Sequence, residues 1–388
     1  MFLTLFNITI LLFIAYSGLI IFYRLGWIKA PEFHVTLTTK APSTKITIII
    51  PARNEAKNIQ NCLYSVIAQS YPKELFEIIV IDDYSTDHTA AIVRSFSDKN
   101  VKLLSLKDHV TEGQLIAYKK KAIELAIEQA TGDVIVTTDA DCIVKKNWLR
   151  TIACYYEKYD PAFIAAPVVY SRTSSNEDLG TRFLKIFQAL DFMSLQGITG
   201  ASVHQKIHSM CNGANLAYEK KAFNAVGGFK GIDSIASGDD MLLMYKIYRV
   251  YPERIMFLKS KDAIVETKPV ESVKEFFDQR IRWASKANKY DDKRIFGVLL
   301  FVYIFNVWLG ALLFFGLGIG DIELLFIGAV IAKTILELFF LYPVSDFFSR
   351  KKLLWWFLPA QPFHILYTIT AGWLGRFGSY EWKERRVH

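Results

Sequence analysis

The sequence has few cysteines, and no two of them lie close together in the chain. Its four cysteines are Cys62, Cys142, Cys154 and Cys211, with no CxxC motif among them. This wide separation argues against a structural zinc site and against a disulfide scaffold. It is compatible with a reducing cytosol. The histidines also show no cluster with metal-ligand spacing.

Charge is absent from Met1 to Tyr23. At 1.5 Å per residue this stretch makes about 34 Å of helix, enough to cross a hydrocarbon core of about 30 Å. A signal peptide would have a basic start, a shorter apolar core and a small-residue cleavage site. We therefore expect an uncleaved transmembrane anchor over residues 1–29. Arg24 and Lys29 follow the apolar run, and since basic flanks stay cytoplasmic, the next domain is expected in the cytosol.

The composition excludes disorder and indicates contact with lipid. Of 388 residues, 52% are apolar and 14% aromatic, and the mean hydropathy is +0.21. Such a chain must bury many side chains. Lys and Arg (46) exceed Asp and Glu (38) by 8. This basic surplus suits anionic lipid headgroups, and no nucleic-acid motif accompanies it, so we expect a membrane partner and no nucleic acid.

The region 293–388 is expected to hold about three hydrophobic membrane segments. They are Ile295–Gly320, Leu324–Val344 and Leu353–Gly375. With the anchor, these segments predict a multi-pass protein of the cell membrane. Lys333 and Glu337 stand four residues apart in the second of them, where they can neutralise each other.

The last of these segments leaves two topologies open. Arg350–Lys352 and the tail after Arg376 are both basic and should both be cytosolic. If Leu353–Gly375 crosses the membrane once, these two basic stretches lie on opposite sides and cannot both be cytosolic. Pro359 and Pro362 interrupt the segment, so it either enters and returns as a hairpin or crosses plainly and exports a basic tail.

Residues 44–292 alternate short apolar runs with amphipathic stretches. The expected strands are Ile46–Ile50, Ile78–Ile81 and Val134–Thr137. The expected helices are Lys57–Ser70, Thr89–Phe96 and Ala117–Ala130. Buried strands that alternate with helices predict an α/β domain with a parallel sheet covered on both faces.

Polar side chains follow each predicted strand. The first strand ends in Pro51-Ala52-Arg53-Asn54-Glu55 and the second in Asp82-Asp83-Tyr84-Ser85-Thr86-Asp87. Ligands of parallel sheets bind beyond the carboxyl ends of the strands. Two adjacent acids after an apolar strand are costly unless they bind something. For Asp87 the simpler role is the cap of the helix that begins at Thr89.

The third strand ends in Thr137-Thr138-Asp139-Ala140-Asp141. In an extended segment, residues i and i+2 point the same way, so Asp139 and Asp141 are expected to converge on one cation. Mg²⁺ and Mn²⁺ take carboxylate and phosphate oxygens. A DxD that closes an apolar strand after two other polar strand ends is therefore a candidate divalent-cation site.

These motifs resemble the nucleotide-sugar half of a family 2 glycosyltransferase with the GT-A fold, a Rossmann-like nucleotide-sugar domain. Later motifs agree with it in order. They are Cys211-Asn212-Gly213-Ala214-Asn215, Ser237-Gly238-Asp239-Asp240 and Gln279-Arg280-Ile281-Arg282-Trp283, the last matching QxxRW. The resemblance covers about Ile46 to Asp292 and extends to the flanking membrane pattern.

The resemblance implies a role for each matching residue. Pro51, Arg53, Glu55 and Asp83 would form the nucleoside site. Asp139 would touch the donor and Asp141 the metal, and Asp240 would be the catalytic base. Gln279, Arg282 and Trp283 would line the diphosphate and acceptor end.

The sequence departs from the family pattern at two places. Asp239 stands where the family has Glu, so this position is not expected to bear that role. The run Lys119-Lys120-Lys121 resembles the family's Gly-Lys stretch, with Glu124 where Asn is common. We expect at least two of these lysines to lie on a solvated helix face.

The helix around Gln279–Trp283 is expected to lie along the cytosolic membrane face. Phe276, Phe277, Ile281 and Trp283 would face lipid beside the basic Lys274, Arg280, Arg282 and Lys286. The alternative is a helix whose apolar side packs wholly into the soluble domain.

The resemblance implies a membrane-bound inverting glycosyltransferase of hexosyltransferase type. It would use a nucleotide-diphosphate sugar, with UDP the expected nucleotide, and a lipid or lipid-linked acceptor. Such an enzyme would serve the synthesis of cell-envelope glycans or glycolipids. The sequence allows an oligomer. The sequence leaves two alternatives open. One is a processive polysaccharide synthase, and the other is an inactive scaffold that binds sugar nucleotides.

Overall fold

The computed structural model describes residues 2–36, 40–111, 115–173, 177–207, 210–285, 293–377, 380–382 and 385–387. Lys286, predicted to belong to the interfacial helix, lies outside these residues. The chain forms two compact units. The sheet unit comprises Pro31–Ser171 and Ser209–Lys268, and the helical unit comprises Met1–Ala30, Arg172–His208 and Pro269–His388. Segments 172–208 and 269–285, which the sequence suggested as parts of one domain at 44–292, thus group with the hydrophobic helices.

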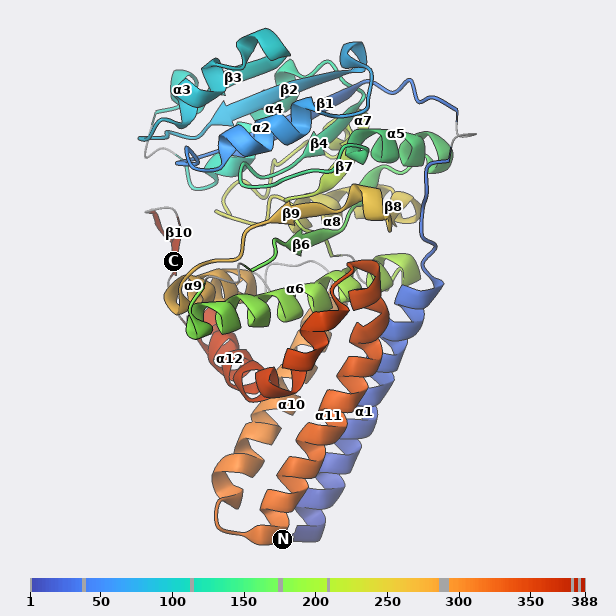
Figure 1. Ribbon diagram of the computed structural model, residues 1–388, viewed down its shortest axis with the longest axis vertical. Helices are drawn as coiled ribbons and strands as arrows, with labels where there is room; N and C mark the ends of the chain where they lie inside the picture. The colour runs from blue at the N-terminus through green and yellow to red at the C-terminus, as the bar shows by residue number, and fades with distance from the viewer. Residues whose placement is uncertain are drawn as a thin grey trace. The chain divides into compact units, whose positions relative to one another are not determined.

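A seven-stranded mixed sheet forms the centre of the sheet unit (Figure 1). Its strands stand in the order β3-β2-β1-β4-β7-β5-β8. Their bounds are β1 Ile46–Ala52, β2 Phe76–Asp82, β3 Val101–Ser105, β4 Val134–Thr137, β5 Phe163–Ala165, β7 Leu216–Glu219 and β8 Ile255–Phe257. β1 to β4 are parallel to one another, as predicted, whereas β7 runs antiparallel to both β4 and β5. β6 (Val168–Tyr170) and β9 (Val265–Thr267) form a separate parallel pair.

The strands form because their apolar side chains are buried on both faces. Ile48, Ile49 and Ile50 are fully buried in β1, which is typical of a sheet covered by helices. The helices of this unit are α2 Ile59–Ile67, α3 Thr89–Arg94, α4 Tyr118–Gln129, α5 Trp148–Tyr159, α7 Lys220–Ala225 and α8 Met241–Val250. Short 3₁₀ turns join them at Lys73–Leu75, Ser97–Lys99, Leu106–Asp108, Pro252–Arg254 and Lys261–Ala263. This arrangement brings the carboxyl ends of β1, β2 and β4 to one edge of the sheet.

The helical unit contains the long helices of the described chain and the shorter, charged helix α9. They are α1 Phe2–Lys29, α6 Leu179–Gln205, α9 Val273–Ala284, α10 Lys293–Gly316, α11 Gly320–Phe347 and α12 Phe357–Phe377, with a 3₁₀ turn at Lys351–Trp356 and a hairpin of β10 Tyr380–Trp382 and β11 Arg385–Val387. α1 packs along α11, and α6 packs on both (Figure 1). Gly26 of α1 permits the close approach of α1 to α6, because a Cβ at this position would lie 2.9 Å from the Ala201 carbonyl oxygen of α6.

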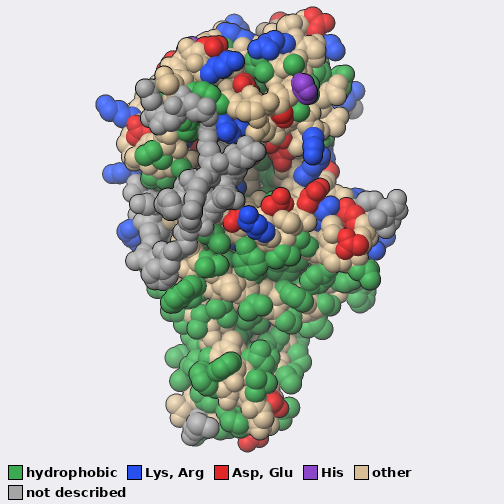
Figure 2. Space-filling model, turned by 90° about the vertical axis from the view of Figure 1, so that its left-hand side faces the viewer, with side chains coloured by type: hydrophobic (Ala, Val, Ile, Leu, Met, Phe, Trp, Pro, Cys, Tyr) green, Lys and Arg blue, Asp and Glu red, His purple; other side chains and the backbone are tan. Residues whose placement is uncertain are grey.

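Three helices of the described chain are long and apolar enough to cross a membrane: α1, α10 and α11. On the face drawn in Figure 2, hydrophobic side chains cover most of the surface of the helical unit. The predicted segment Leu353–Gly375 forms the 3₁₀ turn and α12, with Pro362 inside the helix, and is not among these three. The expected pairing of Lys333 with Glu337 is confirmed, at 2.8 Å between Nζ and Oε1.

Candidate functional site

The ends of β1 and β2 are joined through Arg53 and Asp83. The Arg53 guanidinium donates to the Asp83 backbone oxygen at 2.9 Å, and its Nη1 lies 4.0 Å from the Asp83 carboxylate. Both residues are buried. Pro51 is tolerated in β1 because the pairing of β1 with β4 ends at Ile49. Three of the four residues predicted for the nucleoside site thus lie together at these two strand ends.

The backbone after β1 is held by side chains that follow β2. Asn54 has φ +51°, and its N–H donates to Ser85 Oγ at 3.0 Å. The Glu55 N–H donates to Thr89 Oγ1 at 2.8 Å. Glu55 is the fourth predicted nucleoside contact, and its carboxylate accepts from Asn58 Nδ2 at 2.8 Å. These bonds fix the loop from which the Glu55 side chain extends.

Asp87 has the predicted structural role. It accepts the Thr89 N–H and the Ala56 N–H, each at 2.9 Å. Burial acts to raise its pKa, but the hydrogen bonds from Thr89 and Ala56 outweigh this and hold the pKa below its usual value. Asp87 therefore holds the N–H of the first residue of α3 and ties the helix to the loop after β1, whereas the N-cap position itself is His88.

Asp139 and Asp141 lie on a turn, and the prediction of an extended segment is wrong. β4 ends at Thr137, and the Cys142 N–H donates back to the Asp139 oxygen at 3.1 Å. The alternation argument for their convergence therefore does not apply. The Cys62 thiol donates to the Asp139 backbone oxygen at 3.7 Å, and burial, followed by the charges of Asp141 and Asp139, raises the pKa of this thiol. Asp141 also accepts from Thr267 Oγ1 at 3.0 Å.

Lys119 joins two of the acidic motifs. Its Nζ lies 2.8 Å from Asp139 Oδ1 and 3.2 Å from Asp239 Oδ2. Burial acts to lower the pKa of Lys119, but the charges of Asp139 and Asp239 outweigh it and raise the pKa above the usual lysine value. The ammonium group is therefore charged at neutral pH and links the DxD turn to the Gly-Asp-Asp loop.

Asp240 lies beside this cluster with a fixed carboxylate. Oδ2 accepts the Gly213 N–H at 3.1 Å and Oδ1 accepts the Met241 N–H at 2.7 Å. A Cβ at Gly213 would lie 3.5 Å from Lys119 Nζ and 3.7 Å from Asp239 Oδ2. The glycine-rich turn and the predicted catalytic base therefore lie together with Lys119.

The acidic side chains fit a divalent cation in chemical type. Asp139 and Asp141 are half-buried and offer hard carboxylate oxygens on one turn. Among the described residues, no three Cys, His, Asp or Glu side chains converge as metal ligands. A cation held here would take its remaining ligands from water and from a bound diphosphate.

The QxxRW residues lie on α9 of the helical unit. Gln279, Arg282 and Trp283 are half-buried, whereas Arg280 is 4% exposed and lies 2.6 Å from the Asp191 carboxylate. The expectation that Arg280 belongs to a basic surface is therefore wrong, because α6 supplies a buried partner. Phe276 and Ile281 are also buried by protein and do not face lipid.

The lysine run behaves differently from the expectation. Only Lys121 fits a surface position, where it pairs with Glu124 at 2.8 Å. Lys119 is in the acidic cluster, and Lys120 is 1% exposed. Sequence reasoning also gave no role to Asp239, which the structure places against Lys119. One signal in the sequence could have indicated that Lys119 and Lys120 have partners outside their own helix. Both stand in the first turn of the predicted helix, where the helix dipole disfavours cations.

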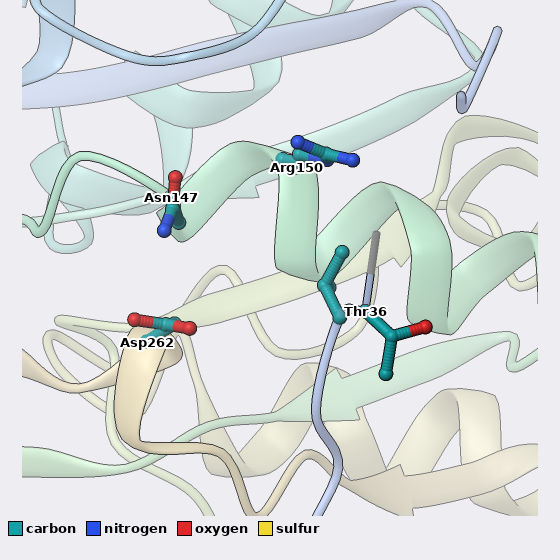
Figure 3. Close-up of a pocket in the computed structure, with 5 residues that line it drawn as sticks. Thr36, Asn147, Arg150 and Asp262 are labelled. Carbon is teal, nitrogen blue, oxygen red and sulfur yellow. The ribbon is translucent and has the colours of Figure 1, made fainter. Parts of the chain in front are cut away.

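A separate pocket lies elsewhere in the sheet unit (Figure 3). It is lined by Val35, Thr36, Asn147, Arg150 and Asp262. Arg150 and Asn147 extend from or next to α5, and Asp262 from the facing 3₁₀ turn. None of the predicted site residues lines it.

Comparisons with known proteins identify a domain in the chain. Residues 47–227 match Glycosyl transferase family 2. The protein named Probable glycosyltransferase YdaM of Bacillus subtilis is 30% identical over 253 residues, which cover 63% of this chain and 56% of that protein. Beta-monoglucosyldiacylglycerol synthase of Synechocystis is 26% identical over 258 residues, covering 66% of this chain and 50% of that protein. The chain thus spans about half the length of these relatives.

A solved structure shares the fold. The mannosyltransferase PcManGT from Pyrobaculum calidifontis, in complex with GDP-Man and Mn²⁺, aligns with a TM-score of 0.58 at 19% identity. The alignment covers 93% of this chain and 99% of that one. At this identity the likeness concerns the fold, and it agrees with the predicted GT-A arrangement. Residues 47–227 thus match the model of family 2 glycosyltransferases, and the chain shares the fold of a GT-A-like neighbour.

Proposed function

We propose that the protein is a membrane-bound inverting glycosyltransferase. It transfers a sugar from a nucleotide-diphosphate sugar, with a UDP-sugar as the expected donor, to a lipid or lipid-linked acceptor. The observation that carries the proposal is the cluster of Lys119, Asp139, Asp239, Asp240 and Gly213. It joins the donor-side DxD turn to the predicted base at one place in a family 2 glycosyltransferase domain.

In this mechanism Asp240 is the general base. Its carboxylate, oriented by the Gly213 and Met241 N–H groups, accepts the proton of the acceptor hydroxyl. The acceptor oxygen bonds to the anomeric carbon as the bond from that carbon to the phosphate oxygen breaks. A nucleoside diphosphate leaves with the bonding electrons, and attack opposite the leaving group inverts the anomeric carbon.

Cationic groups would stabilise the departing diphosphate. Asp139 and Asp141 would hold a divalent cation, which when bound supplies Lewis-acid stabilisation of the diphosphate. Arg282 carries the guanidinium that the family resemblance assigns to phosphate binding, and a guanidinium can make two parallel bonds to a phosphate. Its role and those of Gln279 and Trp283 are part of the proposal.

The three candidate spans support a cytosolic site. If α1, α10 and α11 each cross once, Arg24 and Lys29 at the carboxyl end of α1 fall on the same face as Arg350–Lys352 after α11. The positive-inside rule makes that face cytosolic. α12 would then remain on that side without crossing. Cysteines introduced by Lys351→Cys and Gly318→Cys test this in intact cells with a membrane-impermeant maleimide. We expect labelling of position 318 only, and labelling of position 351 contradicts the topology.

Donor hydrolysis tests the activity itself. Purified full-length protein in lipid nanodiscs is incubated with Mn²⁺ and a panel of UDP-, GDP- and other nucleotide sugars. We expect one donor to release its nucleoside diphosphate, with release stimulated by membrane lipid extract. Addition of one sugar per acceptor supports the proposal, whereas a long polymer indicates a processive synthase. No release from any donor indicates an inactive scaffold.

A further inference from the structure

The ammonium group of Lys120 is buried in a cage of backbone carbonyls. Nζ lies 2.9 Å from the Ile232 oxygen, 2.5 Å from the Ile235 oxygen and 2.9 Å from the Ser237 oxygen. A lysine ammonium has three N–H donors, and these three carbonyls can accept them all. The residue is 1% exposed. Because burying a charge is costly unless its donors are satisfied, the cage is what makes this position tolerable.

The three carbonyls belong to a loop that ends at the predicted base. Residues 232–237 form the loop, and Gly238, Asp239 and Asp240 follow it directly. The loop is bracketed by two glycines in the left-handed region, Gly231 at φ +86° and Gly238 at φ +79°. A non-glycine residue would be strained at either end. Between these two glycines, three carbonyls of the loop surround the Lys120 ammonium.

Helix α4 holds this loop through two consecutive lysines. Lys120 binds the loop carbonyls, and Lys119 pairs with Asp239 at the point where the loop ends. Both lysines lie in the first turn of α4, where the helix dipole disfavours a cation. Their partners in this loop and at its end lie more than 110 residues further along the chain. The contacts outside the helix therefore account for the presence of lysine here.

We propose that Lys120 is a positioning residue that fixes the 232–237 loop and thereby sets the place of Asp240. Lys120 does not touch the reacting groups, since its three donors are directed at backbone oxygens. Without it, three backbone carbonyls lose the ammonium group that they share, and the loop loses its anchor to α4. The donor motifs after β1, β2 and β4 do not depend on the cage. This inference rests on the proposed function, in which Asp240 is the base.

Removal and chemical replacement of the ammonium test the inference. Lys120→Ala in the full-length protein is expected to lower kcat 10- to 100-fold, while the KM for the donor changes less than threefold. The substitution removes three methylenes and the ammonium group, and the removed part has the size of propylammonium. Added propylammonium is expected to restore kcat in a saturable manner, and propanol of the same size is not.

Lys121→Ala is the matched control. Lys121 is the next residue of the same run, but it pairs with Glu124 on its own helix. This variant is expected to keep kcat within twofold of the wild type and to show no response to propylammonium. Retention of wild-type kcat by Lys120→Ala overturns the inference. A loss that propanol restores as well as propylammonium also overturns it.

Hydrogen exchange gives a readout that does not require activity. Lys120→Met keeps the length of the side chain and removes the charge. Faster amide exchange confined to about residues 231–242 is expected, with the strands of the sheet unchanged. Unchanged exchange in that segment, or an increase spread evenly over the sheet unit, overturns the inference. A wild-type protein that hydrolyses no donor contradicts the proposed function but leaves this exchange result to decide the role of Lys120 in the loop.

Discussion

The guanidinium of Arg280 and the carboxylate of Asp191 form a buried ion pair, with 2.6 Å between Nη2 and Oδ2. Asp191 comes from α6 and also accepts from the Tyr367 hydroxyl of α12 at 2.5 Å. The Arg280 guanidinium lies 4.7 Å from the Phe276 ring centroid and 4.2 Å from that of Trp283. The pair joins α9 to α6, and Tyr367 adds α12, so these contacts hold the helix that carries the QxxRW residues.

Breaking this pair should destabilise the helical unit. Arg280→Met leaves the Asp191 carboxylate buried without its partner, and removing one member of such a pair costs about 3–5 kcal/mol. Thermal unfolding of the detergent-solubilised protein measures the effect. The double variant Asp191→Leu with Arg280→Met should recover most of the loss, because no charge remains buried. A wild-type melting curve for Arg280→Met would falsify the structural role.

The neighbouring arginine provides the control. Arg282 is half-buried, so Arg282→Met should unfold near the wild-type temperature. If it binds the donor diphosphate, its loss should lower transfer while the fold persists. Equal melting losses at both positions would show that the two arginines share one structural role.

Asp240→Asn should abolish transfer and spare donor binding. The amide keeps the shape of the carboxylate but cannot accept the acceptor proton, and losing a general base costs about 10²–10⁴-fold in rate. Turnover is compared with donor affinity from isothermal titration. Turnover near that of the wild type removes Asp240 from the mechanism.

Activity should require a divalent cation and fall in Asp141→Ala. The reason is the pair of carboxylates on the turn after β4, which offers hard oxygen ligands. Transfer is measured in excess chelator and after Mg²⁺ or Mn²⁺ is restored. Full activity in the chelator would count decisively against a metal role for Asp139 and Asp141.

Glu77 should make the stability of the sheet unit depend on pH. Its carboxylate accepts from the Thr131 N–H at 2.6 Å, the Thr131 hydroxyl at 2.7 Å and the Thr47 hydroxyl at 2.7 Å. Burial acts to raise its pKa, but these bonds outweigh it and lower the pKa. The contribution is therefore present above the unfolded-state pKa of about 4.3 and is lost as pH falls through the lower folded-state pKa.

Glu77→Gln tests this dependence. At pH 7 the free energy of unfolding of the variant should be about 1–3 kcal/mol lower than that of the wild type, because an amide replaces the charged acceptor. Below about pH 4 the difference between variant and wild type should shrink. Glu74→Gln, three residues earlier on an exposed 3₁₀ turn, is the control and should show little difference at either pH. A difference for Glu77→Gln that is constant with pH contradicts the assignment.

The sequence determined the elements whose signals are local. Runs such as Ile46–Ile50 and Val134–Thr137 predict buried strands because each is an unbroken series of β-branched residues. The first run lies within β1 and the second forms β4. The apolar stretches of α1, α10 and α11 were visible for the same reason. The family motifs also fixed which loops bear acidic side chains, since strand ends and their polar residues are adjacent in the chain.

Only the tertiary structure decided which charged residues are buried and with what partners. Lys119, Lys120 and Lys121 look alike in sequence, but successive helix residues point about 100° apart and so meet different surroundings. Asp239 meets one lysine, loop carbonyls surround the next, and Glu124 pairs with the third. Arg280 is buried, whereas Arg282 is half-buried, because Arg280 pairs with Asp191. Asp191 lies 89 residues away in the chain, and only the packing of α6 brings it to α9. Such partners are set by long-range packing, which no local pattern of residues encodes.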